Sequence, residues 1–122
     1  MYGKFLASDQ TVAINTTQDV SASSAVMKLD DCRKGSITLY VKGGNAGCSK
    51  DVSFAFQAYN PALGEWDTTA YLTLTATLNG TSEVVVTYSV SPGVAGLRLA
   101  TIANPETTSG YTVTANAAYF TD

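Results

Sequence analysis

The sequence contains no histidine, and this absence removes both the most common general base and the most common metal ligand in proteins. Charged residues make up only 14% of the chain, against about a quarter in an average protein. No apolar run approaches the roughly 18 residues of a transmembrane helix, and the first nine residues lack the apolar stretch of a signal peptide. We therefore expect a soluble protein that is made in a cytoplasm and has no membrane partner.

Basic residues are few and form no cluster. The formal net charge is −3, and Arg33 and Lys34 are the only adjacent basic pair. Nucleic-acid binding depends on a basic surface that neutralises phosphates. The sequence therefore predicts no nucleic-acid partner.

Motifs for catalysis are missing as well. No G-x-S-x-G motif occurs, and the glycines at Gly43 and Gly44 lack the following Lys-Ser/Thr of a phosphate-binding loop. Glu65 and Asp67 are the best carboxylate pair, yet a glycosidase needs two carboxylates that face each other across a cleft. The remaining carboxylates, Glu106 among them, are expected to be solvated turn residues. We predict that the protein is not an enzyme and holds no cofactor and no metal ion.

What the sequence does contain is a strict alternation of apolar and polar residues at positions 70–78 and again at 84–90. A period of two indicates β-strands with one buried and one solvated face. Asn79-Gly80 lies between the two runs and favours a two-residue turn with positive φ at both positions. We predict one β-hairpin from these two runs. Its solvated face is a nearly uncharged candidate contact surface made of Tyr71, Thr73, Thr75, Thr77 and Thr87.

Eight segments carry this pattern, and turn residues such as Asn60-Pro61 and Asn104-Pro105 separate them. The predicted strands are residues 11–16, 23–29, 36–42, 52–59, 70–78, 84–90, 96–103 and 111–120. They indicate an all-β fold, a single antiparallel β-sandwich of about eight strands with jelly-roll or Ig-like strand order. The apolar parity changes before Ile102, which predicts a β-bulge near Ala100 and Thr101.

Residues 1–10 fit no strand pattern, so we predict an N-terminal arm ahead of one sandwich domain at residues 11–122. Tyr2, Phe5 and Leu6 are apolar for a free tail, which favours an arm docked on a partner. A disordered tail is the alternative.

Cys32 and Cys48 lie before and after the predicted strand at residues 36–42. Seven strand residues span about 23 Å, whereas bridged Cα atoms lie within about 7 Å, so this separation disfavours an intrachain disulfide. Two free thiols, kept reduced in a cytoplasm, are a second interpretation. The third is an intersubunit disulfide, because each cysteine would lie in a loop where it could meet a neighbouring subunit.

Residues 59–67 hold the only tryptophan, Trp66, and the aromatic Tyr59. Trp66 could open a strand and cover the end of the core, or the loop could stack on a sugar ring. An aromatic loop of this kind can also anchor a protein interface. Tyr59 and Trp66 are therefore candidate interface residues, as are Tyr2, Phe5 and Leu6.

Four phrases of the sequence resemble small β-sandwich structural proteins of tailed bacteriophages. They are GSITLYVKGG at residues 35–44, VSFAFQAY at 52–59, LRLATIAN at 97–104 and GYTVTAN at 110–116. The nearest class is the capsid decoration (cement) proteins. This resemblance implies a non-enzymatic virion protein that binds the outer surface of a phage head, with the major capsid protein and copies of itself as partners. The alternative is a carbohydrate- or cell-surface-binding module of a tail fibre or extracellular protein.

Overall fold

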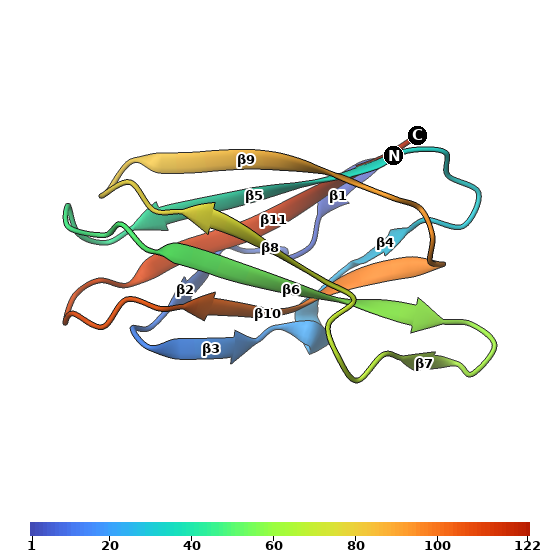
Figure 1. The fold of residues 1–122 in the computed structure, drawn as a ribbon, viewed down its shortest axis with the longest axis horizontal. Coiled ribbons are helices and arrows are strands. Elements are labelled where there is room, and N and C mark those ends of the chain that lie inside the picture. The colour runs from blue at the N-terminus through green and yellow to red at the C-terminus, as the bar shows by residue number, and fades with distance from the viewer.

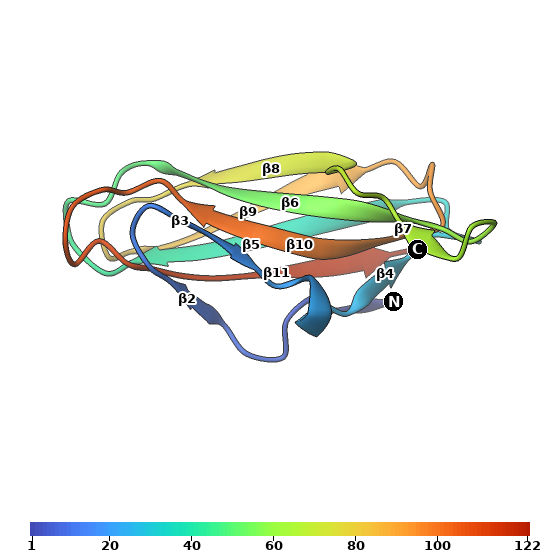
Figure 2. The same ribbon diagram turned by 90° about the horizontal axis from the view of Figure 1, so that it is seen from below.

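Two antiparallel β-sheets lie face to face (Figure 1 and Figure 2). Alternating apolar side chains form one core between them. The computed structural model describes residues 1–122. Its elements are β1 (Tyr2–Lys4), β2 (Gln10–Val12), β3 (Thr16–Asp19), the 3₁₀ turn η1 (Ser21–Ser23), β4 (Val26–Lys28), β5 (Gly35–Gly43), β6 (Asp51–Asn60), β7 (Glu65–Trp66), β8 (Leu72–Thr77), β9 (Glu83–Val90), β10 (Gly96–Asn104) and β11 (Val113–Thr121). The prediction of an all-β antiparallel sandwich is confirmed.

The two layers are termed sheet A and sheet B. In sheet A, β11 pairs with β1 and β2 on one side and with β5 on the other, and β9 forms the edge beyond β5. In sheet B, β10 pairs with β3 and β4 on one side and with β6 on the other. The far edge of sheet B consists of β7 and β8, which both pair with β6. All of these pairs are antiparallel.

Three of the four sheet edges hold two short strands end to end, so the eleven strands fill eight positions. Numbered along the chain, these positions run 1-8-3-6 in sheet A and 2-7-4-5 in sheet B. The first position thus pairs with the eighth, the second with the seventh, the third with the sixth and the fourth with the fifth. An antiparallel ribbon folded over itself produces this order, which is that of the jelly roll. The structure therefore decides between the two predicted strand orders.

The core follows the period-two pattern that the sequence predicts. Ile37, Leu39 and Val41 of β5 and Phe54 and Phe56 of β6 are fully buried between the sheets. Burial of each such side chain contributes about 1.5–3 kcal/mol relative to exposure. The residues between them on each strand face outward and are only partly covered.

The N-terminal residues belong to the sandwich, so the prediction of an arm at residues 1–10 is wrong. β1 and β2 both pair with β11, and between them the chain leaves the sheet and turns into the core. Phe5 and Leu6 are each only 1% exposed. The Phe5 ring lies 5.3 Å from that of Phe56 and 5.1 Å from that of Tyr119. Two adjacent buried residues break the period-two pattern, which is why the sequence pattern does not indicate a strand here.

The predicted hairpin at residues 70–90 is also wrong. β8 lies in sheet B and β9 in sheet A, so the connection between them crosses from one layer to the other (Figure 2). Ser82 N–H donates to the Asn79 carbonyl over 3.1 Å, and of the pair Asn79-Gly80 only Gly80 has positive φ, at +59°. Two strands of one hairpin, and two edge strands that belong to different sheets of a sandwich, both need apolar side chains at every second position on the inward face. The sequence pattern is therefore the same for the two arrangements. Because the strands separate, Thr73 faces outward from sheet B and Thr87 from sheet A.

The predicted β-bulge is confirmed. The register between β10 and β6 shifts between Leu99 and Thr101, which leaves Ala100 as the extra residue. The Ala100 carbonyl accepts a hydrogen bond from Val20 N–H over 2.8 Å. The bulge therefore faces the gap between β3 and β4, where the edge strand is interrupted.

Candidate binding surfaces

β6 and β7 extend beyond the body of sheet B (Figure 1). Tyr59 of β6 lies directly across from Trp66 of β7 in this extension. The turn between these strands is ordered by Asn60, whose side-chain oxygen accepts the backbone N–H groups of Ala62 (3.1 Å) and Leu63 (3.3 Å). The two aromatic rings meet edge to face with centroids 5.1 Å apart. The structure thus brings together two of the predicted interface residues.

Arg98 of β10 completes this aromatic cluster. Its guanidinium lies 4.5 Å from the centroid of the Trp66 ring, a distance at which a cation is attracted to the negative face of an indole. Arg98 Nε donates to Gln57 Oε1 over 2.9 Å, which holds the guanidinium in place. One side of the indole is therefore packed by Arg98, and Trp66 is half-buried.

Two open hollows flank the extension. The first has a volume of about 440 Å³ and is lined by Val26, Lys28, Asp30, Tyr59, Pro61, Trp66, Ala95 and Gly96. The second, of about 540 Å³, shares Tyr59 and Pro61 with the first and contains Asp31, Cys32 and Asp67 in its wall. Glu65 lines neither hollow. Glu65 and Asp67 therefore do not face each other across either of them.

The outer face of sheet A carries a second candidate surface, at the corner where the two chain ends meet (Figure 1). Tyr2 of β1 lies directly across from Phe120 of β11, and these side chains are 82% and 51% exposed. Met1 is exposed beside them, and its carbonyl accepts the Thr121 N–H over 2.7 Å. Val85 of β9, on the same face, is 63% exposed. Of the predicted N-terminal interface residues, only Tyr2 is therefore available on the surface.

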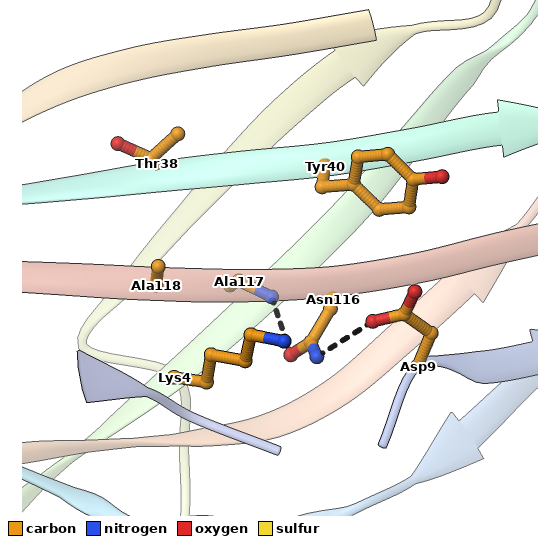
Figure 3. A pocket seen from close by; sticks show the side chains of 7 residues that line it. All are labelled: Lys4, Asp9, Thr38, Tyr40, Asn116, Ala117 and Ala118. Atoms are coloured by element: carbon orange, nitrogen blue, oxygen red, sulfur yellow. Dashed lines mark hydrogen bonds between the residues drawn. The ribbon is translucent and has the colours of Figure 1, made fainter. Parts of the chain in front are cut away.

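A shallow hollow of about 270 Å³ opens on this same face, where the chain leaves the sheet between β1 and β2 (Figure 3). Asn116 lies at its centre between Lys4 and Asp9. The Asn116 side-chain amide donates to the Leu6 carbonyl (3.1 Å) and to Asp9 Oδ1 (2.9 Å). Asn116 therefore replaces the strand hydrogen bonds that are lost where residues 5–9 depart.

Tyr40 of β5 forms the opposite wall of this hollow (Figure 3). Partial burial raises the pKa of its phenol, and the carboxylates of Glu83 and Asp9 raise that pKa further. The hydroxyl is therefore neutral at physiological pH and presents both a donor and an acceptor. The hollow offers polar groups of both hydrogen-bonding types on an otherwise weakly charged face.

Asn104 and Glu106 form a buried polar cluster next to the β5–β6 loop, and the sequence pattern does not predict it. Glu106, expected to be a solvated turn residue, is only 3% exposed. Its Oε2 atom accepts the backbone N–H groups of Ser49 and Lys50, each over 2.9 Å. Asn104 Oδ1 accepts the Glu106 N–H, and Asn104 Nδ2 donates to the Val12 carbonyl. The cluster connects residues 104–106 to the β5–β6 loop and to β2, which are far away in the sequence. No local motif therefore predicts it.

The two cysteines are free thiols in loops at opposite ends of β5, as the length of that strand implied. Cys48 is only 2% exposed, and its carbonyl accepts the Gly80 N–H over 2.8 Å. The burial of Cys48 argues against the third interpretation, an intersubunit disulfide, because the β5–β6 loop packs this thiol inward. Cys32 is partly exposed in the wall of the second hollow.

No family model and no curated protein matches this chain. The structure also contains no helix with the length and apolar character that crossing a membrane would demand.

Proposed function

We propose that this protein is a non-enzymatic virion structural protein, a decoration protein that binds the outer surface of a phage head through the outer face of sheet A. The observation that carries the proposal is the exposure of Tyr2 and Phe120 as a cross-strand pair on that face. Aromatic residues are enriched at the centres of protein interfaces and carry a large share of binding energy there.

The rest of the face suits a protein neighbour. Four strands about 4.8 Å apart, with nine residues at about 3.3 Å each, present roughly 570 Å². Each partner in a standard interface buries about 800 Å², so this face supplies most of that area. The outward residues of β5 are Ser36, Thr38, Tyr40 and Lys42. Hydroxyl groups lose less free energy than charged groups when they leave water. The hydroxyl-bearing part of this surface, at Ser36, Thr38 and Tyr40, can therefore be covered by a capsid subunit with a small desolvation penalty.

The test is direct. Particles purified from the phage that encodes the chain should contain it in a fixed ratio to the major capsid protein, measured by quantitative mass spectrometry. Particles that lack the chain should rebind purified protein saturably, and the double variant Tyr2→Asp, Phe120→Asp should bind at least tenfold more weakly. Val26→Asp places a single carboxylate of the same kind at an exposed position on sheet B and should bind like wild type. Absence of the chain from the particles would overturn the proposal.

A carbohydrate-binding module is the second candidate, and the first hollow favours it. Trp66 and Tyr59 line that hollow together with Lys28 and Asp30, and aromatic rings beside charged hydrogen-bonding groups are suited to a sugar. Jelly rolls occur both in viral capsid proteins and in lectins, so the fold is compatible with both candidates.

Glycan-array binding distinguishes the two candidates. This second candidate predicts saturable binding that Trp66→Ala abolishes. Tyr71→Ala, which removes another partly exposed aromatic residue, should leave that binding unchanged. No binding to any glycan, together with saturable binding to phage particles, would leave the decoration protein as the function.

A further inference from the structure

We propose that β9 is an interface strand through which two copies of this chain pair antiparallel, joining their A sheets into one continuous sheet. The proposal concerns the isolated protein and does not depend on its place in a virion. It rests on the contrast between β9 and the other three sheet edges.

Each of the other edges is interrupted. The chain leaves the edge at residues 5–9 between β1 and β2, at residues 20–25 between β3 and β4, and at residues 67–71 between β7 and β8. The longest uninterrupted strand among them is β8, with six residues, and the Thr75 carbonyl of β8 accepts the Tyr88 hydroxyl over 2.6 Å. Broken edge strands are a common protection against pairing with another chain.

β9 has no such protection. It pairs with β5 through eight consecutive residues without a register shift, from Glu83 to Val90. It contains no proline and no lysine, and it is uncharged from residue 84 to residue 90. No backbone hydrogen bond joins these residues to any segment other than β5. β9 lies along one margin of the molecule with no strand beyond it (Figure 1). Its outward N–H and C=O groups are therefore free to pair.

Register and charge favour a second copy as the occupant. β9 is the longest uninterrupted edge strand, whereas β8 has six residues and its Thr75 carbonyl is already bonded to Tyr88. A second β9 is therefore the best partner for β9. A two-fold axis at Val86 or at Thr87 pairs seven residues from each copy. With the axis at Val86 the carboxylate of Glu83 faces the hydroxyl of Ser89, and every other pair in either register joins apolar or hydroxyl side chains. The two Glu83 carboxylates then lie more than about 20 Å apart, at about 3.4 Å per residue, beyond the screening length of about 10 Å. No like charges therefore oppose the pairing.

Disulfide trapping tests the pairing in both registers. All samples carry Cys32→Ser. If the axis lies at Thr87, the two Thr87 residues face each other, so Thr87→Cys alone should cross-link. If the axis lies at Val86, Val85 of one copy faces Thr87 of the other, so an equal mixture of Val85→Cys and Thr87→Cys should cross-link. Directly opposite residues in antiparallel strands have Cβ atoms about 4.5–5.5 Å apart, near the separation in a disulfide. Thr75→Cys, on the outer face of β8, is the matched control. Mild oxidation followed by non-reducing electrophoresis should give a dimer from at least one β9 sample and none from the control.

A second measurement tests the same surface without cysteine chemistry. Light scattering after size exclusion should show a concentration-dependent dimer of the native chain. Val85→Lys with Thr87→Lys should lower the dimer fraction at least tenfold, and Thr73→Lys with Thr75→Lys should not. The proposal is overturned if neither β9 sample forms a cross-linked dimer while circular dichroism shows an intact fold. Equal cross-linking of Thr75→Cys, or equal dimerisation of both lysine variants, also overturns it.

Discussion

Replacing Phe5 by alanine tests whether the N-terminal segment is part of the core. The Phe5 side chain is 1% exposed, and its ring packs on the rings of Phe56 and Tyr119. Truncation of a buried phenylalanine destabilises a protein by about 3–5 kcal/mol, and aromatic pairs add about 0.5–1.5 kcal/mol beyond burial. We expect Phe5→Ala to lower the free energy of unfolding by about 4 kcal/mol. A domain of this kind has about 5–15 kcal/mol in total.

Urea unfolding followed by circular dichroism measures the change. Tyr2→Ala is the matched control, because Tyr2 is 82% exposed three residues away and a surface substitution changes stability by only about 0.5 kcal/mol. Phe5→Leu keeps most of the apolar volume and should lose about 1–2 kcal/mol, so it remains measurable if Phe5→Ala does not fold. A loss below about 1 kcal/mol for Phe5→Ala, equal to that of Tyr2→Ala, would show that residues 1–10 are an arm and refute the reasoning.

Three further predictions follow from polar contacts and from the cysteines. Glu106→Ala should lower the free energy of unfolding by about 1–3 kcal/mol in urea titrations, because the backbone N–H groups of two residues lose the buried carboxylate that accepts them; a neutral result contradicts this role. The Ser21 N–H and hydroxyl lower the pKa of Asp19 below 3.8, so its stabilisation is present above pH 3.8 and is lost as the pH falls through the lower folded-state pKa. The melting temperature of Asp19→Asn should therefore fall less than that of the wild type as the pH is lowered; equal pH profiles of the two melting temperatures argue against this. A thiol reagent should label Cys32 in the native protein and Cys48 only after unfolding; equal native labelling would contradict the burial of Cys48.

The two proposed surfaces of sheet A are compatible with each other. The outer face presents Tyr2 and Phe120 on the side of β1 and β11, whereas pairing uses the opposite edge at β9. A dimer through β9 would place two such faces side by side in one continuous sheet and double the surface available to a neighbour. Two-point attachment raises overall affinity without any new contact. Binding to particles should then weaken when the β9 edge is blocked, even though no residue of the outer corner changes.

The candidate sites were predictable only where they depend on local chain geometry. Tyr59 and Trp66 flank one short turn, so their proximity follows from a two-stranded extension. Asn116 and Glu106 look like ordinary outward or turn residues in sequence. Their roles arise because residues 5–9 leave the sheet beside Asn116, and because the β5–β6 loop directs its N–H groups at Glu106. Such partners lie 50 or more residues away, beyond the reach of a period or a motif.

The sequence by itself determined where the main strands lie, which side chains face the core, and that β10 carries a bulge. Period-two alternation is a property of each strand alone, because its inward face must be apolar whichever neighbour it has. Only the tertiary structure decided which strands are neighbours, since the backbone of any antiparallel strand can pair with any other. That is why β8 and β9, which read as one hairpin, lie in different sheets. It is also why Phe5 and Leu6, which read as an arm, complete the core.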